Sequence, residues 1–527
     1  MRNLTSKTVF LLAGGLAIVS CSQPEKESKR PNILFIMSDD HTQQAISAYG
    51  SDLTHTPHID RLADEGAIFR QSFVTNSICA PSRAVMLTGK HSHINGKVDN
   101  LQSFNWDQEN VAKIMRRSGY QTALIGKIHL DGHPQGFDYS IVLPGQGHYF
   151  NPVFIENGER RIIEGHCSPI TTDLTLNWLE NIRDKDKPFL LMYHQKAPHG
   201  PWMPELKYLD FMEDRDFDFP DSFFDDYQGR GTAAREQEME IVNHIGWRRL
   251  KFENDPHTGE PTALMRDIER MTDEQLETWR AFYGPRNQAF IDESPQGREL
   301  AKFKFQRYLR SYLKTAKSVD DGIGEVMAWL EKNNLLDNTI IIYTSDQGFY
   351  LGEHGWFDKR FMYEESFSTP LVMRYPPEIK PSTEINELVM NLDLAPTFLD
   401  YAGVDKPGDM QGRSFRELVA GKQPSWRDAV YYHFYEYPSI HMVKRHYGVR
   451  TDRYKLIHFY YDIDEWELYD LHADPNEMQS VYGDPAYLEI QEMLHERLEE
   501  LRLQYGDSDE LNQYYLERAI GLQDSLR

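Results

Sequence analysis

Cysteine is scarce in this chain, with three residues among 527. A framework of disulfides therefore cannot hold the fold together, and each cysteine needs its own explanation. Basic residues are also too few to balance the acidic ones, 57 against 82, which gives a formal net charge of -25. This charge excludes a general nucleic-acid-binding surface, so we expect no nucleic-acid partner, although it still permits a local basic pocket.

Long hydrophobic runs are missing beyond the N-terminus. Residues 9–19 are almost wholly apolar, which is too short for a membrane span and typical of a signal segment. The run closes with Ile18-Val19-Ser20-Cys21, which resembles a bacterial lipobox. The resemblance implies a signal peptide over residues 1–20, lipidation of Cys21 and a polar tether over residues 21–30. The expected product is an extracytoplasmic lipoprotein, in the periplasm or on the outer-membrane surface, that touches the membrane only through its lipid anchor. The alternative is a plain secretory signal with an incidental cysteine.

What the chain does contain is the pattern of an α/β protein. Its length corresponds to two to four domains at roughly 150 residues each. Short runs rich in β-branched residues alternate with helical patterns, which indicates a large, mostly parallel sheet covered by helices on both faces. The clearest runs are residues 32–37, 122–125, 189–193 and 339–343.

The pattern also suggests domain limits. We expect a main domain over residues 31–415 and a smaller α+β domain over residues 416–527. Residues 205–297 are acidic and aromatic with few strand signals, and we interpret them as a surface insertion with some helix. Within it, Thr272-Asp-Glu-Gln275 predicts a helix start with a capping box, and a longer helix is expected over residues 299–333.

Ionisable residues follow each of the four predicted strands. Asp39 and Asp40 follow the first, and Asp346 and Gln347 follow the last. Because ligands bind at the carboxyl ends of strands in open α/β sheets, we expect these side chains to meet. Three carboxylates and an amide oxygen suit Ca²⁺ or Mg²⁺ and not zinc. Any single Asp could instead be a helix cap or a turn residue.

Cys79 lies in Asn76-Ser-Ile-Cys-Ala-Pro-Ser-Arg83, just before a helical pattern. A thiolate near a helix N-terminus would have a lowered pKa and could act as a nucleophile. A soft thiolate is nevertheless a poor match for a hard, oxygen-ligated cation. A disulfide with Cys167 is a second interpretation. His91 and His93 have ligand-like spacing, but a solvated loop is the simpler interpretation.

The run Cys79-Ala-Pro-Ser-Arg83 followed by Leu87-Thr88-Gly89 resembles the signature of type I sulfatases, members of the alkaline-phosphatase-like superfamily. The remaining family motifs are matched in order by Asp39-Asp40, Gly126-Lys127-Ile128-His129, Ala197-Pro-His199, Ser345-Asp346-Gln347-Gly348, Gly352-Glu353-His354-Gly355, Lys359 and Glu467-Leu-Tyr-Asp-Leu471. The resemblance implies a sulfuric ester hydrolase. It also implies a partner enzyme, the formylglycine-generating sulfatase-maturing enzyme, that oxidises Cys79. The hydrated aldehyde would be an oxygen nucleophile and a ligand for one Ca²⁺.

The same resemblance implies roles for individual residues. The metal ligands would be Asp39, Asp40, Cys79, Asp346 and Gln347, the last of which is Asn in many members. The catalytic residues would be Cys79, Arg83, Lys127, His129, His199 and Lys359. Arg83 and Lys127 would hold the nucleophile, Lys127 and Lys359 would clamp sulfate oxygens, His199 would protonate the leaving oxygen and His129 would take a proton from the second hydroxyl. The alternative is that Arg83, Lys127 and Lys359 only form salt bridges and that His129 and His199 are structural histidines.

Substrate choice rests on fewer residues. Residues 355–364 and the run Gln195-Lys-Ala-Pro-His199 look most like the N-acetylglucosamine-6-sulfatase branch, which acts on heparan-type glycosaminoglycans. We therefore expect a sulfated oligosaccharide, recognised by Lys196, His354, Arg360 and a basic rim of Lys444, Arg445 and His446 in the run His441-Met-Val-Lys-Arg-His446. The alternative for this run is a solvated stretch of charge. The alternatives are a sulfatase for another sulfated sugar, a phosphonate or phosphate monoester hydrolase of the same fold, or a non-catalytic lipoprotein that binds sulfated glycans.

Overall fold

The structure is a computed structural model that describes Met1 and residues 30–526, with side chains to residue 522. The predicted lipidation site at Cys21 and nearly all of the predicted signal peptide and tether lie outside the described residues. Residues Pro31–Arg527 form one compact unit. Among the described helices, none combines the length and apolar character needed to cross a bilayer.

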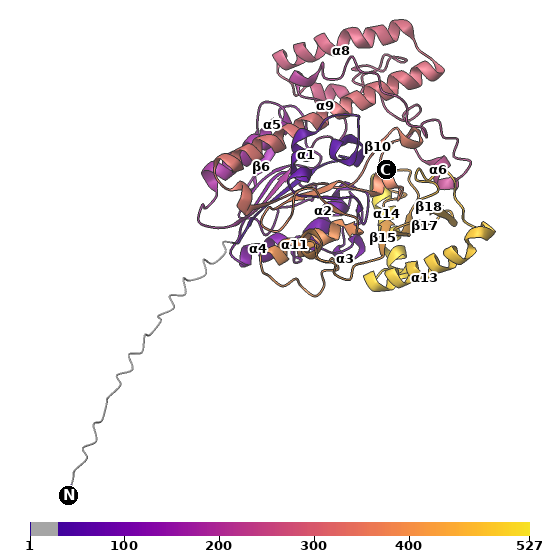
Figure 1. The fold of residues 1–527 in the computed structure, drawn as a ribbon. Coiled ribbons are helices and arrows are strands. Elements are labelled where there is room, and N and C mark those ends of the chain that lie inside the picture. Colours follow the sequence, from indigo (N-terminus) through magenta and orange to yellow (C-terminus); the bar gives the residue numbers. More distant parts are fainter. Residues whose placement is uncertain (2–29, 527) are drawn as a thin grey trace. The chain divides into compact units, whose positions relative to one another are not determined.

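The main element of this unit is a ten-stranded sheet (Figure 1). Its strands, in spatial order, are β13 (Thr383–Ile385), β2 (Ala67–Phe69), β12 (Leu371–Arg374), β9 (Thr339–Ser345), β1 (Asn32–Ser38), β8 (Phe189–His194), β4 (Gln121–Lys127), β5 (Tyr139–Leu143), β6 (Val153–Glu156) and β7 (Glu159–Ile162). The central strands β9, β1, β8, β4 and β5 run parallel, whereas β12, β6 and β7 pair in antiparallel fashion. The predicted mostly parallel sheet is thus confirmed, and all four predicted strands lie side by side in it.

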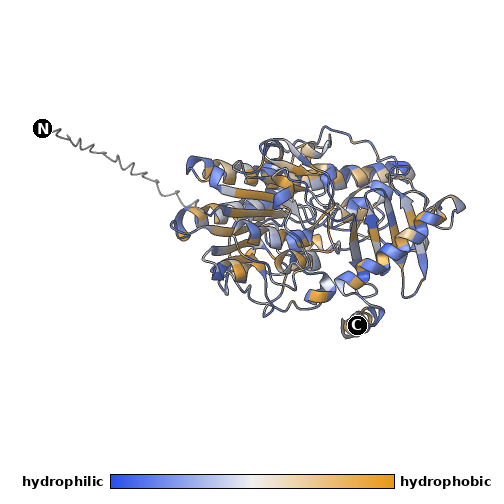
Figure 2. Cartoon of the chain, turned by 60° about the horizontal axis from the view of Figure 1, so that its bottom comes forward, coloured by the Kyte–Doolittle hydropathy of each residue, from blue (hydrophilic) through white to orange (hydrophobic). Residues whose placement is uncertain are grey.

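Helices cover both faces of this sheet, as the apolar strands require. On one face, Leu34 and Ile36 of β1 pack in a core with α1 (Pro57–Asp64), α5 (Cys167–Asn177) and α9 (Gly297–Lys332). On the other, Ile33 and Phe35 pack with α2 (Cys79–Thr88), α4 (Val111–Arg117) and α11 (Leu394–Tyr401). Figure 2 shows hydrophobic residues concentrated on the strands of the large sheet and hydrophilic ones on the outer helices.

The predicted insertion contains three α-helices, α6 (Thr232–Glu236), α7 (Leu264–Ile268) and α8 (Asp273–Glu293), and no named strand lies in it. The capping box at Thr272 is confirmed, because its side chain accepts from the Gln275 amide and Gln275 caps the Thr272 amide in return. In Figure 1, α8 lies beyond α9, on the side away from the sheet. The long predicted helix is α9.

A second sheet follows in the C-terminal part. It is antiparallel and consists of β15 (Ala429–Phe434), β16 (His446–Thr451), β17 (Tyr454–Phe459) and β18 (Glu465–Asp470). Helix α13 (Leu488–Tyr505) packs on one face through Leu494, Leu498 and Leu501, and α14 (Asp509–Leu526) ends the chain.

The remaining strands and short α-helices lie outside these two sheets. They are β3 (Ser72–Phe73) with β14 (Val389–Met390), β10 (Tyr350–Leu351) with β11 (Phe357–Asp358), and the short helices α3 (Ser92–Asn95), α10 (Glu364–Phe367) and α12 (Arg416–Val419). The expectation that His91 and His93 lie in a solvated loop is wrong. His93 is buried with its Nε2 2.9 Å from the carbonyl oxygen of Tyr505, and His91 Nδ1 lies 3.0 Å from Gln411 Oε1. The end of α13 covers them, which the local sequence could not show.

Candidate active site

The site lies at the carboxyl edge of the four central strands. Asp39 and Asp40 follow β1, and the Asp39 amide donates to the carbonyl oxygen of Ala197 beyond β8 (3.2 Å). The Asp346 amide, just beyond β9, donates to Ser38 at the end of β1 (3.3 Å). Lys127 is the last residue of β4. Parallel pairing brings these side chains together from segments far apart in the sequence, as predicted.

Three buried carboxylates meet at this edge. Oxygen atoms of Asp39, Asp40 and Asp346 lie within 4.8 Å of one another. Arg83 joins two of them, with Nε 3.0 Å from one oxygen of Asp346 and Nη2 3.3 Å from Asp39. Lys127 forms an ion pair with Asp39, and Lys359 forms one with Asp40. Three cations thus surround three buried acids.

The acids are unequal in their affinity for protons. Burial opposes the charge of Asp39, yet Lys127, His199 and Arg83 hold the pKa of Asp39 well below its ordinary value. Burial, with Asp39 and Asp346 adding to it against Lys359, raises the pKa of Asp40 to about 7. The pKa of Asp346 is raised by burial and by Asp39. Carboxylates crowded in this way are relieved by a cation between them.

The donor set fits a hard divalent cation. Besides the three carboxylates, Gln347 is buried and its amide nitrogen donates to Asp346 (2.7 Å) and to Asp40, while its Oε1 accepts no hydrogen bond from the described residues. An amide oxygen without a partner in a buried acidic cluster is a free hard ligand. Asp39, Asp40, Asp346 and Gln347 are therefore suited to Ca²⁺ or Mg²⁺.

Cys79 is the first residue of α2 and is buried beside this cluster. Its Sγ lies 3.1 Å from Lys359 Nζ and 3.5 Å from Asp39 Oδ1. The lowered pKa expected from the helix N-terminus is wrong, because burial and Asp39 raise the pKa of the thiol, against Lys359. Cys79 and Cys167 are both free cysteines, so the alternative of a disulfide between them is not realised.

The two predicted catalytic histidines differ in their surroundings. His199 Nδ1 lies 2.8 Å from the carbonyl oxygen of Gly200, and Nε2 lies 3.9 Å from Asp40 Oδ2. His129 follows β4 with a positive φ of 55°, and it does not line the cavity described below. Burial and the charge of Lys127 lower the pKa of both rings well below the ordinary value. Burial opposes the charge of Lys359, but Asp40 raises the pKa of its ammonium.

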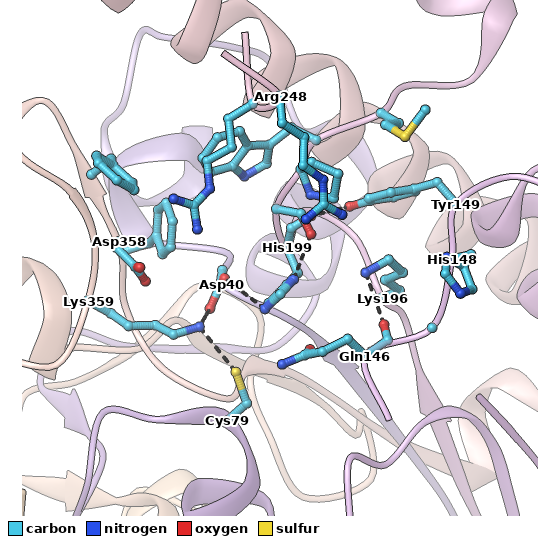
Figure 3. A pocket seen from close by; sticks show the side chains of 18 of the residues that line it. Asp40, Cys79, Gln146, His148, Tyr149, Lys196, His199, Arg248, Asp358 and Lys359 are labelled. Atoms are coloured by element: carbon cyan, nitrogen blue, oxygen red, sulfur yellow. Dashed lines mark hydrogen bonds and ion pairs between the residues drawn. The ribbon is translucent and has the colours of Figure 1, made fainter. Parts of the chain in front are cut away.

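A cavity of about 420 Å³ opens above Cys79 (Figure 3). Two of the predicted substrate-binding residues line it. Lys196 Nζ donates to the Gln146 carbonyl (3.0 Å) and lies 4.8 Å from the Tyr149 ring centroid, and burial and Lys127 lower the pKa of Lys196 to about 8. Arg360 Nη1 is paired with Asp358 at 2.8 Å.

Four other predicted substrate-binding residues do not line the cavity. His354 is fully buried elsewhere, with Nδ1 3.4 Å from Asp225 and Nε2 3.8 Å from Glu365. The predicted basic rim of Lys444, Arg445 and His446 is also displaced from it. The reason is that their side chains are engaged within the C-terminal part and its neighbours: Lys444 with Asp462 (2.6 Å) and Glu236 (3.0 Å), Arg445 with Tyr460 (3.1 Å), and His446 with the Met362 amide (3.1 Å).

The cavity wall also contains residues that the sequence interpretation missed. They are contributed by the insertion and by loops beside the strand ends: Tyr149, Trp202, Arg248, Arg249 and Asp267. His441, which begins the predicted basic run and lies between β15 and β16, also lines the cavity. The one local signal for the missed residues was the basic pair Arg248-Arg249 inside an acidic segment. The insertion is therefore part of the site and not only a surface feature.

Comparison with known proteins agrees with this arrangement. The model of the family described as Sulfatase matches residues 31–404, and the model described as N-sulphoglucosamine sulphohydrolase, C-terminal, matches residues 352–504. The N-acetylglucosamine-6-O-sulfatase of Bacteroides thetaiotaomicron is 48% identical over 95% of this chain and 92% of its own length. The human N-acetylglucosamine-6-sulfatase is 26% identical over 76% of this chain and 67% of its own length.

Among solved structures, that of BT4656 in complex with its substrate D-glucosamine-2-N,6-O-disulfate superposes with a TM-score of 0.88 at 48% identity. The match covers 91% of this chain and 99% of that one. The resemblance drawn from residues 79–83 is confirmed, and the chain belongs to the sulfatase family.

Proposed function

We propose that this sulfatase removes the 6-O-sulfate of N-acetylglucosamine or glucosamine in heparan-type glycosaminoglycan fragments. The observation that carries the proposal is the position of Cys79 at a sugar-sized cavity, 3.1 Å from Lys359 and beside three buried carboxylates. The names of the relatives at 48% and 26% identity, and the disulfated glucosamine bound by BT4656, support this choice of ester.

Two groups complete the proposed site. Formylglycine made from Cys79 by a maturing enzyme would supply an oxygen nucleophile, and one Ca²⁺ held by Asp39, Asp40, Asp346, Gln347 and residue 79 would supply positive charge to it and to the sulfate. The high pKa of the unmodified thiol is in keeping with this assignment, because a buried neutral thiol is a poor nucleophile.

The side chains of the chain itself bind and orient the ester. Lys359 and Lys127 lie on two sides of the cluster, each paired with one carboxylate, and their ammonium groups are placed to hold sulfate oxygens. Arg83 bridges Asp39 and Asp346 and fixes both acids from helix α2. These contacts pre-organise charge where the sulfate ester gains it during cleavage.

His199 is placed to deliver the proton to the leaving sugar oxygen from its protonated ring, a form that the bound anionic ester favours against burial and Lys127. Its Nδ1 is held by the Gly200 carbonyl, so Nε2 is the nitrogen that faces Asp40 and the cavity (Figure 3). His129, beyond Lys127, keeps its proposed role as the base for the second hydroxyl, and its Nδ1 has no partner among the described residues.

A panel of esters tests the proposed specificity. Purified protein with position 79 converted should release sulfate from N-acetylglucosamine 6-sulfate, and far more slowly from the 3-sulfate, from 2-O-sulfated uronate disaccharides and from phosphate or phosphonate monoesters. Cys79→Ala should abolish release, and Lys302→Met, on the exposed side of α9, should not. Faster turnover of a phosphorus ester, or of another sulfated sugar, would select one of the alternatives. Binding without release by converted protein would select the glycan-binding lipoprotein.

We also propose that the protein is an extracytoplasmic lipoprotein, anchored through Cys21 in the periplasm or on the outer-membrane surface. The apolar run that ends at Cys21 supports this location. Labelling of the protein with a radioactive or clickable fatty acid in its host tests it. Cys21→Ser should lose the label, and equal labelling of both forms would contradict the proposal.

A further inference from the structure

Most basic side chains on the cavity wall already have an acidic partner. The ion pairs are Lys359–Asp40, Arg360–Asp358, Arg248–Asp267 and His441–Glu436. Arg249 differs from them. Among the described residues, no carboxylate forms an ion pair with the guanidinium of Arg249. No described residue accepts a hydrogen bond from its side-chain nitrogens either.

Aromatic rings surround this guanidinium instead. Its central carbon lies 4.9 Å from the ring centroid of Phe357 and 5.8 Å from that of Trp202, and the residue is half-buried. Burial lowers the pKa of Arg249, against the charge of Asp358, but a guanidinium stays protonated at physiological pH. A partly desolvated cation without an acidic partner costs stability, so such a group is usually kept for a ligand.

The backbone of Arg249 is fixed next to the catalytic residues. The buried ammonium of Lys251 donates to the carbonyl oxygens of Pro201 (2.8 Å) and Arg249 (2.5 Å), and Asn287 of α8 donates to the Lys251 carbonyl (2.8 Å). A Cβ added at Gly200 would lie 3.8 Å from Arg249 Nε. Gly200 follows His199, and Phe357 precedes Lys359 by two residues, so Arg249 lies between the loops that carry the proton donor and the sulfate clamp.

We infer that Arg249 binds a second anionic group of the substrate, distinct from the ester sulfate that is cleaved. This inference rests on the proposed function and extends it to substrate selection. Heparan-type substrates offer two such groups, the N-sulfate of the same glucosamine and the carboxylate of a neighbouring uronic acid. Both are oxyanions that the guanidinium fork binds with two parallel hydrogen bonds. The insertion would thus make the enzyme select the more highly charged units of the chain.

Ratios of kcat/KM test the inference. The substrates are N-acetylglucosamine 6-sulfate, glucosamine N,6-disulfate and a disaccharide of uronic acid with N-acetylglucosamine 6-sulfate. Arg249→Ala should lower the ratio of a doubly charged substrate to the first by about 10- to 100-fold, the usual effect of removing a charged hydrogen bond. Arg249→Lys should restore part of it. The matched control is Arg280→Ala, an insertion arginine paired on the surface with Glu253, which should leave the ratios unchanged.

The two doubly charged substrates distinguish the N-sulfate from the uronic acid carboxylate as the group that Arg249 binds. A lower ratio for the disulfate alone assigns the N-sulfate, and a lower ratio for the disaccharide alone assigns the carboxylate. Unchanged ratios in Arg249→Ala would overturn the inference. So would equal losses on all three substrates, since Arg249 would then contact the ester sulfate or the sugar common to them.

Calorimetric binding keeps this result separate from the proposed function. The Cys79→Ala protein should bind glucosamine N,6-disulfate, or the disaccharide, more tightly than N-acetylglucosamine 6-sulfate, and Cys79→Ala/Arg249→Ala should lose that difference. If converted wild-type protein cleaves none of the three esters, the proposed function fails, while an Arg249-dependent difference in Kd still upholds the subsite. The subsite would be overturned if Cys79→Ala bound all three substrates with equal Kd values, as Cys79→Ala/Arg249→Ala should, or if it bound none of them.

Discussion

The ammonium nitrogen of Lys359 lies 3.1 Å from Sγ of Cys79, and the same nitrogen is paired with Asp40. One cation thus connects the proposed site of modification with a proposed metal ligand. Burial of all three groups strengthens this interaction because little solvent screens it.

Replacing Lys359 should therefore impair turnover, and the loss of its pair with buried Asp40 should also lower the free energy of unfolding. We expect Lys359→Met to lower kcat/KM by about 100- to 1,000-fold, the usual effect of removing one pre-organised donor from developing charge. Lys302→Met, an exposed lysine of α9 paired with Asp216, is the matched control. Kinetics and thermal unfolding on the same preparations separate the two effects. Full activity in Lys359→Met would rule out its role as a sulfate clamp.

Calcium should stabilise the fold through the three carboxylates. Protein stripped with a chelator should unfold at a lower temperature than protein with added Ca²⁺. Bound calcium should raise the free energy of unfolding by about 2.7 kcal/mol when the ion is at 100 times its Kd. Asp346→Asn removes one of the three carboxylate charges, weakens calcium binding and should reduce the calcium-dependent shift in Tm. Asp428→Asn, an exposed acid paired with Arg497, should keep it. A Tm that is independent of calcium in the wild type would contradict the proposed cation site.

The pH dependence of kcat/KM should reveal Lys196. Burial and Lys127 lower the pKa of Lys196 to about 8, so its ammonium is charged below this pH and neutral above it. Because the substrate is anionic, kcat/KM should fall as pH rises through about 8. Lys196→Arg stays charged and should shift or remove this fall. Lys196→Met should have a low kcat/KM both below and above pH 8. A wild-type profile that matches Lys196→Arg at every pH would exclude this role.

The C-terminal sheet should contribute to stability and not to specificity. Lys455 of β17 is fully buried and pairs with Glu477 (2.7 Å) and Glu364 (2.9 Å), which joins the sheet to helix α10. Lys455→Met leaves the buried carboxylate of Glu477 without a cation, while Glu364 keeps its pair with Arg450 (3.3 Å), and we expect the change to cost about 3–5 kcal/mol in the free energy of unfolding. Lys422→Met, exposed and paired with Glu417, should cost little. Equal denaturation midpoints for the two variants would contradict this interpretation.

Local patterns were enough to predict the strands, the helix cap at Thr272 and the gathering of ionisable side chains at one edge of the sheet, whereas the roles of these side chains rest on the resemblance to sulfatases. The strand runs carry buried β-branched residues. Parallel pairing of these strands brings the residues that follow them to one edge of the sheet, whatever the conformation of the loops: Asp39, Lys127, His199 and Asp346. The strand pattern could therefore locate the candidate active site before any contact was known.

The rest of the cavity depends on long-range packing. Arg249 reaches the site because Lys251 ties the insertion to Pro201, and no periodicity encodes that contact. His354 looks like a pocket residue in its motif, but Asp225 from the insertion and Glu365 enclose it. Lys444 and Arg445 form a basic run in the sequence, yet Asp462, Glu236 and Tyr460 engage them in the fold.

The central claim is that position 79 acts as formylglycine. It is tested most directly by mass spectrometry of the peptide that contains position 79, from protein made in its native host, with and without a carbonyl-reactive hydrazide. We predict the mass of the aldehyde, converted to its hydrazone by the reagent. A peptide that carries only an unmodified Cys79 thiol, in protein that still cleaves the 6-sulfate, would contradict the proposed chemistry.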